Sequence, residues 1–178
     1  MWIEIEMYVL LFFACSFLGW CMEVACKLVQ FGRFINRGFL LGPLFPIYGT
    51  GAVLMAYFLP LWTTQVESTF LLALVLCGTL EYITSWLMEK LFHARWWDYS
   101  QKRFNINGRV CASNLLAFGV MGVFVVKVLK PFAFGLFAKI PPVWLDAITI
   151  TLTALLIADV VISAGVLTKI RGAAESVR

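Results

Sequence analysis

Five long apolar segments determine what this chain can fold into. They cover residues 7–29, 40–62, 69–88, 110–126 and 143–167. Each is close to the roughly 20 residues that a helix needs to cross a hydrocarbon core of about 30 Å. Lipid offers backbone amides no partner outside a helix or a closed barrel, and a barrel would show alternating apolar and polar residues. The segments therefore predict an all-α, polytopic membrane protein with five transmembrane helices, forming one integral membrane domain over residues 1–178.

The composition excludes the main soluble classes. Of the 178 residues, 62% are hydrophobic and only 13% are charged, whereas a soluble domain carries about a quarter charged residues. This excludes a soluble globular domain, a disordered chain and a nucleic-acid binder with a basic patch. The five cysteines stand singly among apolar residues, without the spacing of a zinc or iron–sulfur site. We expect a lipid environment, free thiols, no metal or other cofactor and no nucleic-acid partner.

The distribution of lysine and arginine predicts the orientation. With the N-terminus outside and the C-terminus cytoplasmic, the inner loops and the inner end of the chain hold eleven of the 14 basic residues, and Lys127, Lys130 and Lys139 lie outside. The opposite orientation would place eleven basic residues outside. Because cytoplasmic loops carry an excess of lysine and arginine, the first orientation is the one we expect.

Acidic residues within the apolar segments are candidates for function. Glu23 lies late in the first segment, Glu81 near the middle of the third and Asp159 deep in the fifth. Ser85 and Glu89 follow Glu81 at four-residue steps, so all three share one helical face. An ionised carboxylate at such depth costs a few kcal/mol unless it is paired, protonated or hydrated. The arginines expected to pair with them are Arg37, Arg95 and Arg109. Buried ion pairs of this kind also serve as purely structural orientation devices.

Prolines and glycines interrupt the second apolar segment. Pro43 and Pro46 remove backbone donors, and each disfavours helical angles in the residue before it. Residues 42–51 are therefore predicted to be broken or re-entrant, and backbone of this kind persists at membrane depth only where protein or a water-filled cavity covers it. A proline-kinked helix start at the membrane interface is the alternative.

A polar run follows the third segment. Trp96 and Trp97 suit an anchor in the headgroup layer. Asn105, Asn107 and Gly108 suit a turn before the fourth helix. The density of hydrogen-bonding groups in this run exceeds what anchoring needs, which makes candidates of Arg95, Asp98, Asn105 and Arg109.

Several motifs together resemble a known family. Gly19, Trp20 and Glu23 form Gly-Trp-x-x-Glu, and residues 37–49 read Arg-Gly-Phe-Leu-x-Gly-Pro-x-x-Pro-Ile-Tyr-Gly. Leu-Glu-Tyr at 80–82, Arg-Trp-Trp-Asp-Tyr-Ser at 95–100 and Phe-Asn-x-x-Gly at 104–108 complete the set. Over most of Phe17–Gly122, the chain resembles the bacterial ABC-transporter permease family of type IV. The resemblance implies a transport subunit in the bacterial cytoplasmic (inner) membrane. The sequence contains no Walker A motif, so any ATPase would be a separate subunit.

Three functions fit these residues. The first is a transport or channel subunit for a small solute or ion, acting as a homo-oligomer or with a partner subunit. Its expected binding residues form a cluster near the cytoplasmic side and are Glu23, Arg37, Tyr48, Glu81, Glu89, Arg95, Asp98, Asn105 and Arg109. The second is a membrane-embedded enzyme for a lipid or isoprenoid phosphate, in which the arginines and Asn105 hold the phosphate and Glu81 or Asp98 acts as base. The third is a scaffold or sensor subunit of a membrane complex.

Overall fold

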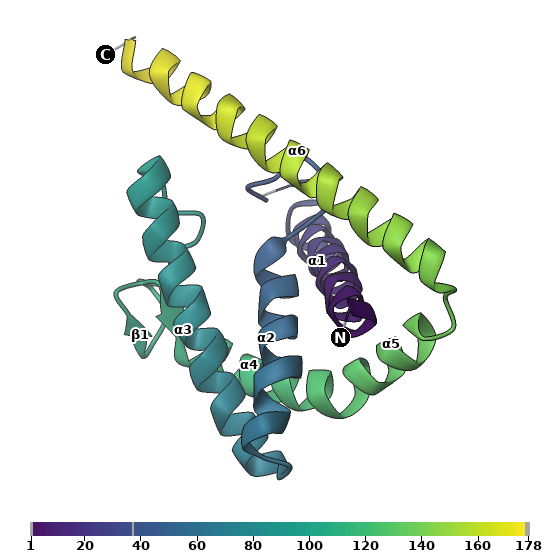
Figure 1. Ribbon diagram of the computed structural model, residues 1–178. Coiled ribbons are helices and arrows are strands. Elements are labelled where there is room, and N and C mark those ends of the chain that lie inside the picture. Colours follow the sequence, from purple (N-terminus) through teal and green to yellow (C-terminus); the bar gives the residue numbers. More distant parts are fainter. Residues whose placement is uncertain (1, 37, 177–178) are drawn as a thin grey trace.

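The computed structural model describes residues 2–36 and 38–176, with side chains described as far as Lys169 (Figure 1). The helices are α1 Trp2–Phe31, α2 Pro46–Trp62, α3 Val66–Phe92, α4 Ala112–Phe124, the π-helix η1 Val125–Leu129, α5 Lys130–Phe137 and α6 Pro142–Ser176. A two-stranded antiparallel hairpin, β1 Asn105–Ile106 and β2 Val110–Cys111, precedes α4. The all-α prediction is confirmed, since this short hairpin is the one addition to the helices in the described residues.

Within the described residues, four helical segments are long and apolar enough to cross a membrane. They are Trp2–Phe31, Val66–Phe92, Ala112–Phe137 and Pro142–Lys169. The chain is thus a multi-pass membrane protein. The remaining predicted span, residues 40–62, corresponds to α2, which has 17 residues. At 1.5 Å per residue α2 is about 25 Å long, so its length alone does not confirm that it crosses.

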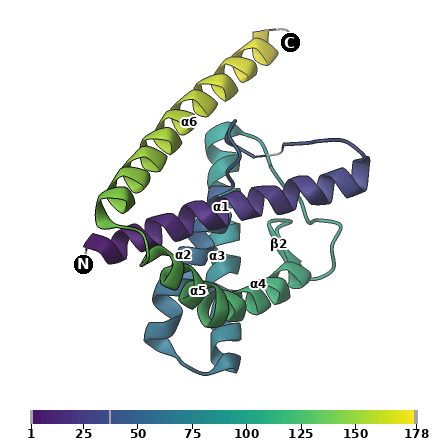
Figure 2. The same cartoon turned by 90° about the vertical axis from the view of Figure 1, so that its right-hand side faces the viewer.

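The helices cross one another at wide angles. Figure 2 shows α1 lying across the α2–α3 pair, while α6 lies on the outside of the other helices. The core gathers around the buried face of α2, which carries small residues such as Gly49, Gly51, Ala52 and Ala56. Gly49 lies directly against the backbone of Phe12 and the hydroxyl of Ser16 in α1. Without a hydrophobic driving force in lipid, such close backbone approach is what holds membrane helices together.

The second helix begins later than the apolar segment 40–62 predicted. Residues 40–45 are not helical, and α2 starts at Pro46. Proline is tolerated in the first turn, where its missing N–H would have no partner anyway. The break predicted over residues 42–51 is thus confined to residues 42–45, and the alternative of a proline-started helix describes the rest.

Asp159 of α6 binds the non-helical segment. Its two carboxylate oxygens accept hydrogen bonds from the backbone N–H groups of Leu41 (3.1 Å) and Gly42 (3.0 Å). The hydroxyl of Ser163 donates to the same carboxylate at 2.9 Å. Gly42 leaves no room for a Cβ, because one would lie 2.7 Å from Asp159 Oδ2. The acidic residue noticed in the sequence is half-buried, satisfies two backbone donors outside the helices and attaches α6 to the α1–α2 connection.

The fourth helix continues well past residue 126. The π-turn η1 joins α4 to α5, with the N–H of Lys130 donating to the carbonyl of Val125. Pro131 follows directly and cannot donate, so a widened turn relieves its conflict with the preceding turn. Lys130, expected in an outer loop, instead points into the bundle and donates to the carbonyl of Ala56 at 2.8 Å. That carbonyl lacks its usual helical donor because position 60, four residues on, is a proline.

Candidate functional site

A cavity of about 660 Å³ lies between α1, α2, α3, α4 and the 93–109 loop, which connects α3 to α4. Its walls are mainly apolar and aromatic. The polar groups that enter it come from Glu23, Lys27, Tyr48, Glu81, Asp98, Tyr99 and Asn114. The size suits a small organic molecule rather than a bare ion.

Glu81 is the buried charge of the cavity. It is only 6% exposed. Its Oε1 accepts hydrogen bonds from the hydroxyl of Tyr99 at 3.2 Å and from the amide of Asn114 at 3.3 Å. Its other oxygen, Oε2, is buried and has no hydrogen-bond partner among the described residues. A carboxylate held by two neutral donors retains most of its capacity to bind a further donor or a cation.

Glu23 reaches the same cavity from α1. Its Oε1 accepts a hydrogen bond from the hydroxyl of Tyr48 at 2.9 Å. Tyr48 comes from the first turn of α2, and its ring lies directly on Gly19 of α1. Any side chain at position 19 would displace that ring. The Gly-Trp-x-x-Glu motif therefore has a physical explanation, because its glycine makes room for the tyrosine that its glutamate binds.

The arginines form a separate network beside the cavity. Arg109 is 9% exposed, and it donates to Glu89 at 2.6 Å and to Ser85 at 3.2 Å. Arg95 donates to the same oxygen of Glu89 at 3.0 Å. Glu81 is expected to contact Arg37, Arg95, Arg109 or a bound cation; Arg95 and Arg109 do not contact it, because both are bound to Glu89, two turns further along α3. Arg37 lies outside the described residues.

The hairpin explains how Arg109 is placed. Asn107 and Gly108 have φ angles of 54° and 67°, and the N–H of Arg109 donates to the carbonyl of Ile106 at 3.0 Å. These are the features of a type I′ turn, which favours Asn-Gly. The turn predicted at these positions is present. Asn105 does not enter the cavity; its amide donates to the carbonyls of Lys102 and Ser100 and accepts from Gly108.

Hydrogen bonds within the 93–109 loop position Tyr99 so that its hydroxyl reaches Glu81. The N–H of Tyr99 donates to the carbonyl of Gly108 at 2.7 Å, and the indole N–H of Trp97 donates to the carbonyl of Arg109 at 3.0 Å. Burial raises the pKa of the Tyr99 phenol, and the Glu81 carboxylate adds to this effect. Tyr99 is thus a hydrogen-bond donor throughout the physiological pH range.

Asp98 lies beside Tyr99 at the mouth of the cavity and is exposed. It accepts hydrogen bonds from the hydroxyl and the backbone N–H of Ser100. These bonds lower the pKa of Asp98 below its ordinary value, and Arg95 contributes further. Asp98 therefore remains ionised at neutral pH and adds negative charge to the cavity entrance.

The structure divides the predicted cluster into three parts. Glu23, Tyr48, Glu81 and Asp98 line one cavity. Glu89, Arg95 and Arg109 form the neighbouring ion-pair network, and Asn105 lies in the hairpin. Two residues that touch Glu81, Tyr99 and Asn114, were not singled out from the sequence. An amide within an otherwise apolar segment was the available signal for Asn114.

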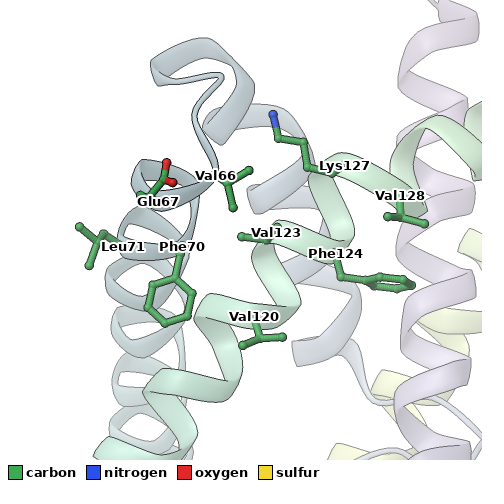
Figure 3. Close-up of a pocket in the computed structure, with 9 residues that line it drawn as sticks. All are labelled: Val66, Glu67, Phe70, Leu71, Val120, Val123, Phe124, Lys127 and Val128. Atoms are coloured by element: carbon green, nitrogen blue, oxygen red, sulfur yellow. The ribbon is translucent and has the colours of Figure 1, made fainter.

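A second hollow of about 700 Å³ lies at the other end of α3 (Figure 3). Valine, leucine and phenylalanine side chains from α3, α4 and η1 line it. The two charged side chains there are Glu67 and Lys127, and Lys127 donates to the carbonyl of Thr64 at 2.6 Å. In a membrane protein, an open apolar groove of this kind is a contact surface for lipid chains, and we place no site in it.

The comparison with known families agrees with the motifs. A family model described as "Putative ABC-transporter type IV" matches residues 10–164. The chain belongs to this family. The matched range includes every residue that lines the cavity between α1, α2, α3 and α4.

As a member of the ABC-transporter type IV family, the chain is an ABC-transporter-related membrane protein. Neither the search of curated proteins nor the search of solved structures gave a match. The geometry of the cavity therefore carries the functional argument.

Proposed function

We propose that this chain is the membrane subunit of a transporter or channel for a small solute or ion, and that the cavity holding Glu23 and Glu81 is its binding site. The observation that carries the proposal is the carboxylate of Glu81. It lies in a membrane helix, is 6% exposed, and presents a buried oxygen without a partner among the described residues. Because a charge at such depth is costly, its presence beside a cavity indicates a functional site.

The proposed orientation places the cavity near the cytoplasmic side. The lysine and arginine distribution favours an N-terminus outside, which makes the 93–109 loop cytoplasmic. Trp96 and Trp97 of this loop line the cavity. The entrance would then open toward the inner leaflet and the cytoplasm of a bacterial inner membrane.

The proposal includes a partner. The sequence has no Walker A motif, so ATP hydrolysis would require a separate ATPase subunit. The largely exposed α6 offers an apolar surface on which a second copy could pack.

The contacts of Arg95, Arg109 and Asn105 give less support to a lipid-phosphate enzyme. Such an enzyme would need these three side chains free to hold a phosphate. The two arginines instead bind Glu89, and Asn105 binds the backbone of its own loop. A scaffold subunit is the alternative that the following experiment addresses.

The test is charge movement across reconstituted vesicles. Protein in liposomes on a solid-supported membrane is exposed to concentration jumps of protons, alkali cations, amines and small carboxylates. We expect a transient current with at least one class of solute. Glu81→Gln removes the charge and keeps the shape, so it should abolish the current.

Glu67→Gln is the matched control. Glu67 lies on the same helix, is exposed and lies outside the cavity. This variant should conduct like the wild type. If correctly inserted protein gives no more current than empty liposomes with every class of solute, or if Glu81→Gln conducts normally, the scaffold reading replaces transport.

A further inference from the structure

We infer that the cavity binds a protonated amine attached to an apolar body. The inference rests on the proposed function and names the chemical class of its ligand. It is drawn from three features of the cavity: the charge of its carboxylates, the hydrogen-bonding capacity that they leave unused, and the aromatic composition of its walls.

Two carboxylates of the cavity, those of Glu23 and Glu81, bind only neutral donors, while Asp98 at the entrance pairs with Arg95. Glu23 accepts from a phenol, and Glu81 accepts from a phenol and an amide. In the part of the chain that the structure describes, the ion pairs link Arg95 to Glu89 and Asp98, and Arg109 to Glu89. Lys27 also lines the cavity and donates to the neutral amide of Gln30 at 2.8 Å, so the three carboxylates of the lining outnumber its one positive charge. The negative charge of the cavity therefore favours a cationic ligand, since buried charges require compensation.

One carboxylate oxygen of Glu81 accepts no hydrogen bond from any described residue, so a ligand that fits the cavity should carry a hydrogen-bond donor. Glu81 Oε2 is buried, without a partner among the described residues, on a side chain that lines the cavity. An ammonium group brings both a positive charge and N–H donors, and a charge-assisted hydrogen bond of this kind is about twice as strong as a neutral one. A quaternary ammonium ion would supply the charge without the donor.

The walls indicate that the amine carries an apolar body. Phe45, Trp96, Trp97 and Phe118 line the cavity together with Tyr48 and Tyr99. Aromatic faces attract cations and also pack against apolar groups. A bare metal ion would leave most of this cavity empty, and the described residues hold no group of three or more acidic, histidine or cysteine side chains placed to ligate one.

The experiment compares three probes of similar size. Binding of 2-phenylethylamine, 2-phenylethanol and 3-phenylpropionate to the full chain in lipid nanodiscs is measured by equilibrium dialysis at neutral pH. The amine and the alcohol are equal in size, the carboxylate is slightly larger, and the three differ in charge and share the aromatic body. We expect the amine to bind at least about tenfold more tightly than the alcohol or the carboxylate, because only the amine combines a hydrogen bond to Glu81 with a positive charge that compensates the carboxylate.

Glu81→Gln should weaken binding of the amine by about ten- to a hundredfold, and Glu67→Gln should leave it unchanged. Glu23→Gln is a second cavity variant that should also weaken binding of the amine. It keeps the test decisive if Glu81→Gln does not fold. Equal binding of the three probes, preference for the alcohol or the carboxylate, or no amine binding at millimolar concentration would overturn the inference.

The two proposals fail in different ways. If the amine binds with the expected selectivity and no solute drives a current, the ligand class stands and the transport function fails. If a carboxylate solute drives a current that requires Glu81, transport stands and the inference of an amine ligand fails.

Discussion

Glu81 and Glu89 lie two turns apart on α3 and have different surroundings. Glu89 accepts from two arginines and is partly exposed. Glu81 is buried and accepts only from Tyr99 and Asn114. The four-residue spacing put both on one helical face, but the 93–109 loop determines which of them receives positive charge. Arg109 directly follows the Asn107-Gly108 turn of the hairpin, and from there it donates to Glu89.

The ion-pair network predicts unequal effects for its two arginines. In Arg109→Lys a single nitrogen replaces the two that donate to Ser85 and Glu89, so the buried hydroxyl of Ser85 or the half-buried carboxylate of Glu89 loses a donor. We expect a loss of about 1–3 kcal/mol in the free energy of unfolding. Arg95→Lys alters an exposed pair and should cost less than about 1 kcal/mol.

Unfolding of the purified protein in mixed micelles by increasing SDS measures both losses. Far-UV circular dichroism checks that the variants begin from the same helical content. Equal losses for the two arginine variants would contradict the assignment of Arg109 as the buried member of the network.

The sequence could predict the acidic residues of the site but not their partners. Glu23 and Glu81 stand out because charge is rare in apolar segments. Tyr99 and Asn114 lie 18 and 33 residues from Glu81 along the chain. Helical periodicity relates residues three or four positions apart and says nothing about contacts at such separations. Those contacts depend on how the loop folds back.

At the scale of elements, glycines on α4 set its distance from α3. A Cβ at Gly122 would collide with the side chain of Ala73, and one at Gly119 would collide with the ring of Phe70. At Gly135 in α5, no atom lies within 4 Å of the added Cβ. The same substitution therefore has opposite expected signs at Gly122 and Gly135.

Gly122→Ala should destabilise the protein by about 1–3 kcal/mol, because it overpacks a close contact. Gly135→Ala should stabilise it by about 0.5–1 kcal/mol, because alanine loses less conformational entropy in a helix. SDS unfolding measures both effects. If Gly122→Ala were as stable as the wild type, α4 would not lie against α3 as the structure has it.

The helices themselves were largely predictable, and their irregularities were not. The apolar segments 7–29, 69–88 and 143–167 lie within α1, α3 and α6, because hydropathy decides which residues can face lipid. The π-turn at Val125–Leu129 depends on more than its own sequence. It directs Lys130 to a carbonyl that Pro60 of another helix has left free. Similarly, the non-helical residues before α2 depend on another helix, because Asp159 of α6 accepts hydrogen bonds from the backbone N–H groups of Leu41 and Gly42.

The whole molecule consists of a packed group and an outlying helix. Helices α1–α4 surround the cavity. In the apolar stretch of α6, only 6% of the residues are buried against the rest of the protein. Hydrogen bonds from the α1–α2 connection to Asp159 attach this helix to the others. Helix α1 lies across α2 and α3 (Figure 2), so the helices do not share one direction that would mark the membrane normal. Helix length and composition are therefore the criteria for deciding which segments cross the bilayer. For α2 these criteria are insufficient, so the number of spans needs a direct test.

Labelling of introduced cysteines determines that number. In a variant whose five native cysteines are replaced by alanine, single cysteines are placed at three exposed positions: Phe34 between α1 and α2, Gln65 between α2 and α3, and Lys102 between α3 and α4. Because eleven of 14 basic residues lie inside in the expected orientation, an impermeant maleimide added to intact cells should label Gln65→Cys alone. Permeabilised cells should show labelling at all three, which confirms accessibility.

Labelling of Phe34→Cys and Gln65→Cys from the same side would mean that α2 does not cross. Labelling of Lys102→Cys but not Gln65→Cys in intact cells would overturn the orientation, and labelling of both from the same side would mean that α3 does not cross.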